Sequence, residues 1–100
     1  MKKTSKVYEI KVDGVRRYIG VSNNTTRRFK EHLRDFHNKD KYLYRMCRES
    51  GLNESHLVLN AITEDLPVLD ARRYEAFLIL EDYFGERLLW QSPPYSFKYF

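Results

Sequence analysis

The chain has 100 residues, of which 42% are hydrophobic, fifteen are aromatic and 32% are charged. This composition excludes a disordered chain, and the length excludes a second domain, so residues 1–100 are expected to form a single domain with a packed core. The formal net charge of +4 and the pI of about 9.2 favour a polyanionic partner.

The charge is distributed unevenly along the chain. Residues 1–50 contain fourteen Lys and Arg against six Asp and Glu, whereas residues 51–100 contain four against eight. The basic half is either solvated surface or a surface for nucleic acid. The single cysteine, Cys47, excludes an intramolecular disulfide and is typical of a small core residue. With no signal peptide and no long apolar run, we expect a cytoplasmic protein without a membrane span.

The first two strands are predicted to form a hairpin. Residues 6–12 and 15–21 are rich in Val, Ile and Tyr and flank Asp13-Gly14. A two-residue turn would place Tyr8 and Tyr18 on opposite faces of the sheet, whereas a three-residue loop would place them directly opposite each other on one face. We predict the three-residue loop. The other face would then carry Val7, Ile19 and Val21.

Two helices are predicted after the hairpin. The side chains of Asn23-Asn24-Thr25 are suited to cap a helix that runs to about Phe36. A second helix is expected over residues 39–50, and Gly51 is typical of a residue that ends a helix.

A third strand and a third helix complete the predicted order β-β-α-α-β-α. Residues 56–63 are apolar on both faces, which indicates a central strand, and Asp65 is suited to cap a helix that ends near Phe84. The fold class is therefore α+β, with a small three-stranded, mainly antiparallel sheet flanked by helices. The aromatic segment from Trp90 to Phe100 is expected to pack back on the domain or to form an oligomer contact.

Two tyrosines of the hairpin are candidate catalytic groups. Tyr8 and Tyr18 are also typical of aromatic pairs that simply stabilise a hairpin. A phenol has an ordinary pKa of about 10, and it acts as a general base only where positive charge or a metal ion lowers that pKa. Arg28 and a bound cation would supply such charge.

The first predicted helix carries an arginine and a histidine on one face. Arg28 and His32 are four residues apart. A guanidinium holds two phosphate oxygens at once, and an imidazole holds or passes a proton near neutral pH. The alternatives are a surface arginine and a hydrogen-bonded histidine at the rim of the core. The basic residues suited to contact a nucleic-acid backbone are Arg27, Lys30 and Lys39.

Glu75 directly precedes the apolar run Ala76-Phe77-Leu78-Ile79-Leu80. An ion pair with Arg72 or a neighbouring element is one explanation, and a ligand for a hard divalent cation is the other. Mg²⁺ commonly takes one or two carboxylates, retains several waters and binds phosphate oxygen as well. Glu75 is therefore the candidate metal ligand, for one Mg²⁺ with Mn²⁺ tolerated, and a single carboxylate implies weak binding without substrate.

The segment from Tyr18-Ile19-Gly20 to His32-Leu33 resembles the second motif and the following helix of the GIY-YIG nuclease superfamily. Lys6-Val7-Tyr8 stands where that family usually has Gly-Ile-Tyr, and Glu75 matches its downstream helical glutamate. The resemblance covers nearly the whole chain, and its specificity lies in the joint spacing. It implies a small, divalent-metal-dependent endonuclease that cleaves phosphodiester bonds in DNA.

The same resemblance implies a role for each matching residue. Tyr8 would be the general base that activates water, and Tyr18 would support it by hydrogen bonding. Arg28 would hold the scissile phosphate, His32 would assist proton movement, and Glu75 would bind the metal ion.

The sequence departs from the family near its C-terminus, and two further interpretations stay open. The family often carries Asn after a tyrosine there, whereas Ser96 follows Tyr95, and Ser96 or Gln91 is the candidate substitute. One alternative is a basic DNA-binding module without catalysis, and the other is a nuclease subunit whose specificity comes from a partner. Glu75 favours an enzyme, because a carboxylate near phosphates weakens DNA binding unless a cation lies between them. With no zinc finger or helix-turn-helix in the sequence, we expect low sequence specificity; a homodimer or a protein partner stays open.

Overall fold

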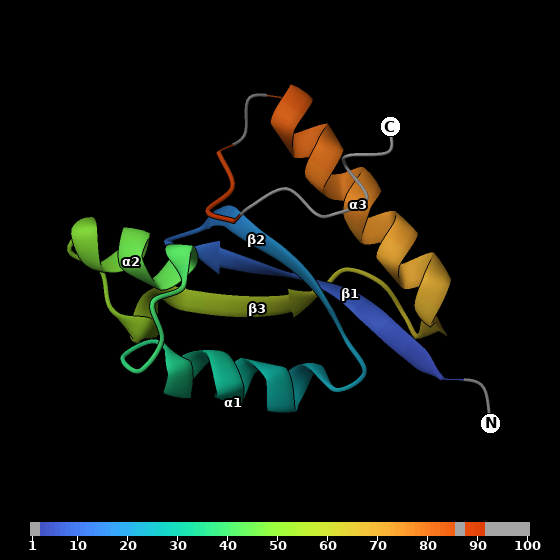
Figure 1. Ribbon diagram of the computed structural model, residues 1–100, viewed down its shortest axis with the longest axis horizontal. Coiled ribbons are helices and arrows are strands. Elements are labelled where there is room, and N and C mark those ends of the chain that lie inside the picture. The colour runs from blue at the N-terminus through green and yellow to red at the C-terminus, as the bar shows by residue number, and fades with distance from the viewer. Residues whose placement is uncertain (1–2, 86–87, 92–100) are drawn as a thin grey trace.

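The structure is a computed structural model that describes residues 3–85 and 88–91. In chain order its elements are β1 (Thr4–Val12), β2 (Val15–Ser22), α1 (Thr25–Asp35), α2 (Tyr42–Glu49), the 3₁₀ helix η1 (Glu54–His56), β3 (Leu57–Ala61), β4 (Leu66–Pro67) and α3 (Val68–Phe84). The predicted α+β fold is confirmed, with the two-residue strand β4 in addition (Figure 1).

β1 is the central strand of an antiparallel sheet. It pairs with β2 on one side and β3 on the other, and its first residues pair with β4. The prediction that residues 56–63 form a central strand is wrong, because β3 lies next to β1 alone on the path β2-β1-β3 and its Val58 is 51% exposed. The central strand is instead recognised by continuous burial, which extends over residues 7–10 of β1.

The sheet separates two apolar clusters, with α1 and α3 on opposite sides of the strands in Figure 1. On the side of α1 and α2, the buried members are Tyr8, Ile10, Val12, Phe36, Leu43, Tyr44, Cys47 and Leu57. On the side of α3, they are Val7, Ile19, Ala71, Leu78, Ile79 and Leu89. None of the helices in the described residues has the length and apolar character needed to cross a membrane.

The turn of the first hairpin has two residues rather than the predicted three. Asp13 and Gly14 both have positive φ, at 53° and 83°, and Val12 pairs with Val15. Two consecutive residues with positive φ form the tight turn that matches the twist of paired strands. The predicted three-residue loop is therefore wrong.

A bulge on β2 nevertheless returns the two tyrosines to one face. The register shifts along the hairpin, so that Arg17 is an extra residue without a partner in the register. Tyr8 pairs with Gly20, and Tyr18 pairs with Ile10 two positions away. The shared face of the tyrosines was predicted correctly, but for the wrong reason, since the bulge and not the turn produces it.

The start of α1 and the end of α2 agree with the sequence prediction, whereas α2 begins at Tyr42 rather than at residue 39. Asn24 caps α1, with its side-chain oxygen accepting a hydrogen bond from the backbone N–H of Arg27 at 3.0 Å. Gly51 follows α2 with a φ of 76°, and the backbone N–H of Leu52 donates to the carbonyl of Cys47 at 2.9 Å. The Asn24 side-chain cap and the glycine with positive φ after α2 are the structures that the sequence predicted at these two helix ends.

The start of α3 differs from the prediction. Asp65 does not cap this helix, because Leu66–Pro67 form β4 and the helix begins only at Val68. Pro67 occupies the cap position, where no side-chain hydrogen bond is made. Pairing of β4 with Thr4–Ser5 fixes this segment as extended chain and moves the helix start beyond Asp65.

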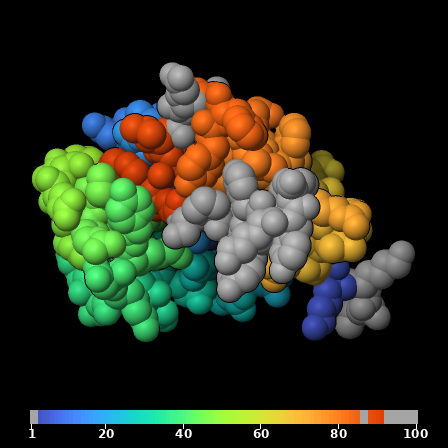
Figure 2. Space-filling model, turned by 45° about the horizontal axis from the view of Figure 1, so that its top comes forward, coloured from blue at the N-terminus to red at the C-terminus, as the bar shows by residue number. Residues whose placement is uncertain are grey.

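The segment 88–91 runs along the open edge of β2. The Trp90 N–H donates to the carbonyl of Arg17 at 2.7 Å, and the Gln91 side chain bonds both the N–H and the carbonyl of Ile19, at 2.6 and 2.9 Å. Leu89 packs in the cluster of α3 and Trp90 against the opposite one. Figure 2 shows this segment, in red, between α2 and α3. Residues 88–91 thus pack on the domain, as predicted for the start of the C-terminal aromatic segment. Residues 92–100 of that segment lie outside the described residues.

Candidate active site

Tyr8 lies at the centre of the candidate site, in the middle of β1. Its side chain is 1% exposed and points toward α1. A Cβ added to Gly20, its partner on β2, would lie 2.5 Å from both Cζ and the hydroxyl oxygen of Tyr8. The glycine of the Tyr-Ile-Gly motif therefore provides the space that the Tyr8 ring occupies.

Tyr18 lies beside Tyr8 on the same face. The two ring centroids are 6.2 Å apart, and the ring planes are inclined by 30°. Lys41, which precedes α2, donates from Nζ to the Tyr18 hydroxyl at 2.9 Å and lies 4.6 Å from the ring centroid. Because Lys41 occupies an acceptor position of that hydroxyl, the proton of Tyr18 is available for another group. The sequence analysis did not identify Lys41.

His32 joins α1 to the two strands. It is fully buried rather than at the core rim, and its Nε2 lies 3.0 Å from the Tyr8 hydroxyl. Its Nδ1 lies 2.6 Å from the hydroxyl of Tyr44 on α2. The sequence analysis also missed Tyr44, although Tyr44 is three residues before the buried Cys47 and therefore on the same helix face.

Burial keeps the imidazole of His32 uncharged near neutral pH. It lowers the pKa of His32 from 6.5 to about 3, with the positive charges of Arg28 and Lys41 acting in the same direction and Asp35 opposing them. Near neutral pH the imidazole is therefore neutral, with one N–H donor and one acceptor nitrogen. In the free protein it acts by hydrogen bonding rather than by carrying a proton.

The phenol of Tyr8 is also held in its neutral form. Burial raises its pKa above the ordinary value of 10.0, and Tyr18 and Glu75 act in the same direction, whereas Arg28 lowers it. The charge of Arg28 is thus present at Tyr8 but is smaller in effect than burial. A base at this position requires additional positive charge.

Arg28 is half-buried on α1, within reach of Tyr8 and in an ion pair with Glu31 at 3.7 Å. The two neighbouring candidates on the basic surface, Arg27 and Lys30, are exposed, as is Lys39 after the helix. Arg27 donates from Nη2 to the side chain of Asn23 at 2.9 Å. These exposed cations lie outside the buried cluster, in positions open to solvent.

Glu75 is the half-buried carboxylate of α3. Burial raises its pKa, and the positive charge of Arg72 opposes the shift. The negative charge of Glu75 makes a minor contribution to the raised pKa of Tyr8, while α3 packs against the apolar cluster on the other side of the sheet from α1. In the described residues no hydrogen bond or ion pair joins Glu75 to Tyr8, Tyr18, Arg28 or His32. Among the described residues no group of three or more His, Cys, Asp and Glu side chains is suited to a metal ion. Glu75 offers one carboxylate, and a Mg²⁺ ion held by one carboxylate takes its remaining ligands from water and phosphate oxygens.

One of the two candidate substitutes for the family's C-terminal asparagine, Gln91, lies in the described residues. Gln91 is occupied by the backbone of Ile19 at the edge of β2. Tyr95 and Ser96 lie outside the described residues.

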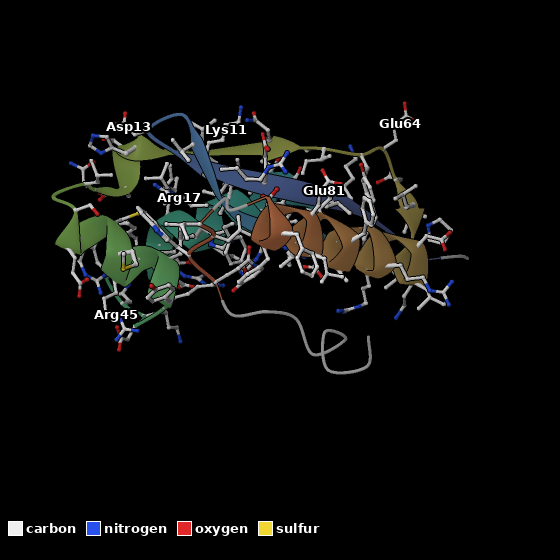
Figure 3. The ribbon with its side chains drawn as sticks, turned by 90° about the horizontal axis from the view of Figure 1, so that it is seen from above. Lys11, Asp13, Arg17, Arg45, Glu64 and Glu81 are labelled. Atoms are coloured by element: carbon white, nitrogen blue, oxygen red, sulfur yellow. The ribbon has the colours of Figure 1, made fainter. Side chains whose placement is uncertain are left out.

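A second group of charges lies between β1, β2 and α3. Arg16 donates from Nε to Glu9 at 2.8 Å, and its Nη1 lies 3.5 Å from Asp82, a carboxylate that is 1% exposed. Glu9 and Arg16 of this group also line a surface hollow of about 650 Å³, together with Lys11 of β1 and Arg17 of β2. Figure 3 labels Lys11 and Arg17. Arg16 thus lies between two buried carboxylates, and Lys11 also pairs with Glu9 at 3.8 Å, so these charges have a structural role.

A comparison of the chain with protein-family models, with curated proteins and with solved structures finds no match. The likeness to GIY-YIG nucleases therefore depends on the sequence motifs and their spacing alone.

Proposed function

We propose that the chain is a divalent-metal-dependent endonuclease that hydrolyses phosphodiester bonds in DNA with low intrinsic sequence specificity. The observation that carries the proposal is the arrangement of Tyr18 and His32 around the Tyr8 hydroxyl, with Arg28 beside it. The assignment of Glu75 to the metal ion comes from the sequence resemblance, and its negative charge makes only a minor contribution to the raised pKa of Tyr8.

In this proposal Tyr8 accepts the proton of the attacking water while Arg28 binds the scissile phosphate through its guanidinium. The raised pKa of Tyr8 means that its anion forms only when more positive charge reaches the site. A divalent cation, when bound, supplies that charge and stabilises the negative charge that develops on the phosphate. Glu75 is the residue that would hold it.

The exposed cations of residues 25–41 suit the DNA backbone. Arg27, Lys30 and Lys39 are open to solvent on the side of the sheet where Tyr8 and Tyr18 lie. Lysine and arginine contacts to phosphate are independent of base sequence. Low intrinsic specificity follows, and a partner or a second copy of the chain would be needed for a defined cleavage site.

The burial of Tyr8 favours a second candidate, a basic DNA-binding module without catalysis. A base must reach its water, and Tyr8 has 1% of its surface exposed. In this alternative the tyrosines and His32 stabilise the core, and only the exposed cations contact DNA.

A plasmid-nicking assay separates the two candidates. The nuclease proposal expects the parent to nick DNA with Mg²⁺ or Mn²⁺ and to be inactive in EDTA, and it expects Tyr8→Phe to lose at least about a hundredfold in rate. Tyr42→Phe, an exposed tyrosine on α2, is the matched control and retains full activity. DNA binding without nicking by the folded parent would establish the binding module instead.

A further inference from the structure

Tyr8, His32 and Tyr44 form a buried group joined through the His32 ring. Tyr44 has no role in the proposed function. Its side chain is 1% exposed, and its hydroxyl lies 2.6 Å from Nδ1 of His32. The opposite nitrogen of that ring, Nε2, lies 3.0 Å from the hydroxyl of Tyr8. One imidazole ring therefore connects Tyr44 of α2 to Tyr8 of β1.

The neutral state of the ring limits how protons are arranged along this connection. A neutral imidazole donates from one nitrogen and accepts at the other. Burial keeps His32 neutral, and the charged groups that act on it, Arg28, Lys41 and Asp35, leave its pKa lowered. If Tyr44 donates to Nδ1, Nε2 must carry the hydrogen that is directed to Tyr8, and the reverse holds if Tyr44 accepts.

The two distances distinguish these arrangements. Hydroxyl donors make hydrogen bonds of about 2.7 Å, whereas N–H donors make bonds of about 2.9–3.0 Å. The 2.6 Å contact fits Tyr44 donating its O–H to Nδ1, and the 3.0 Å contact fits His32 donating its Nε2–H to the oxygen of Tyr8. The opposite tautomer would give each bond the length typical of the other donor.

We propose that Tyr44 is a positioning residue that holds His32 in the Nε2-protonated tautomer, so that His32 donates a hydrogen bond to the oxygen of Tyr8. The proton of Tyr8 is then directed away from His32, and it leaves to solvent before the oxygen of Tyr8 accepts a proton from the attacking water. The donated bond also favours the anion of Tyr8. This catalytic consequence rests on the proposed function, whereas the tautomer does not.

The tautomer is tested by ¹H–¹⁵N correlation spectroscopy of the protein with ¹⁵N-labelled histidine at pH 7. In the parent we expect a one-bond N–H at Nε2 of His32, no hydrogen bonded directly to Nδ1, and a slowly exchanging hydroxyl proton correlated with Nδ1. Tyr44→Phe keeps the ring and removes that proton, so we expect its signal to vanish and Nδ1 to become partly protonated. Tyr42→Phe makes the same chemical change on the exposed face of α2 and should leave the spectrum unchanged.

A parent spectrum with the hydrogen on Nδ1 would overturn the proposal whether or not the variant folds, and so would an unchanged His32 spectrum in folded Tyr44→Phe. The catalytic consequence is read from nicking rates per folded molecule, where Tyr44→Phe should lose about tenfold and Tyr42→Phe nothing. A full rate in Tyr44→Phe would contradict the positioning role. If the parent itself does not nick DNA, the proposed function fails while the spectrum still decides the tautomer.

Discussion

Gly20 determines where the Tyr8 ring can lie. An alanine Cβ at this position would approach two atoms of that side chain to 2.5 Å, and the ring is held by His32 on its other side. We therefore expect Gly20→Ala to displace Tyr8, to break the bond to His32, and to lower the free energy of unfolding by about 1–3 kcal/mol. Urea denaturation measures the stability, and the His32 ring signals report the bond.

Gly14→Ala is the matched control for this substitution. Gly14 has a φ of 83° with no atom within 4 Å of an added Cβ, so alanine there costs about 1 kcal/mol through backbone strain alone. The His32 signals should not change. Gly20→Ala with parental stability and parental His32 signals would show that Tyr8 does not depend on this glycine.

His32 makes stability depend on pH. Its pKa is lowered from 6.5 to about 3 in the folded protein, so the unfolded chain binds the proton first and stability falls as the pH drops below about 6.5. Between pH 6.5 and 5 we expect a loss of about 2 kcal/mol from this residue. Urea denaturation at several pH values should give His32→Gln a visibly flatter profile, with His37→Gln, an exposed histidine, as control. Equal slopes in the parent and His32→Gln would contradict the assignment.

Some contacts of the candidate site could be predicted from the sequence and others could not. The two kinds differ in how many residues separate the partners along the chain. The pairing of Arg28 and His32 on one helix face is local, and the helical period predicts it. The bonds of His32 to Tyr8 and Tyr44 span 24 and 12 residues, and that of Lys41 to Tyr18 spans 23. Such contacts depend on how helices pack on the sheet, which no local pattern specifies.

At the scale of elements, helix starts offer a direct comparison. Asn24 makes a cap bond to α1, whereas Asp65 makes none to α3 because β4 separates it from the helix. We expect Asn24→Ala to lower the free energy of unfolding by about 1 kcal/mol and Asp65→Ala by less than about 0.5 kcal/mol. Urea denaturation of the two variants checks this. An equal loss in both would mean that Asp65 acts on α3 after all.

The hairpin shows why element order was predictable and register was not. Alternation and Asp13-Gly14 indicate two paired strands, but they permit either loop length. The bulge at Arg17 is supported from 71–73 residues further along, where Leu88 accepts from the Arg17 side chain at 2.8 Å and Trp90 donates to its carbonyl. Local sequence therefore predicts the strands, and the distant edge segment determines which residues face the helices.

At the scale of the whole molecule, the unequal charge of the two halves predicts how the proposed DNA binding would respond to salt. Removing a cation that binds one phosphate reduces the slope of log affinity against log salt concentration by about 1. We expect this reduction for Lys30→Ala, without a change in sequence preference. Arg73→Ala, which removes an exposed cation from α3, is the control and should leave the slope unchanged. Fluorescence anisotropy across a salt series measures both, and equal slopes in the parent and Lys30→Ala would remove residue 30 from the DNA surface.

The proposed participation of Glu75 of α3 in the site formed by the hairpin and α1 is tested most directly by the plasmid-nicking rate of Glu75→Gln in Mg²⁺. Glu81→Gln makes the same change on an exposed side chain of the same helix (Figure 3). We predict that the parent and Glu81→Gln nick DNA at equal rates, while Glu75→Gln binds DNA but loses at least about a hundredfold in rate. Nicking by Glu75→Gln at the parental rate would show that the carboxylate of α3 takes no part in the site.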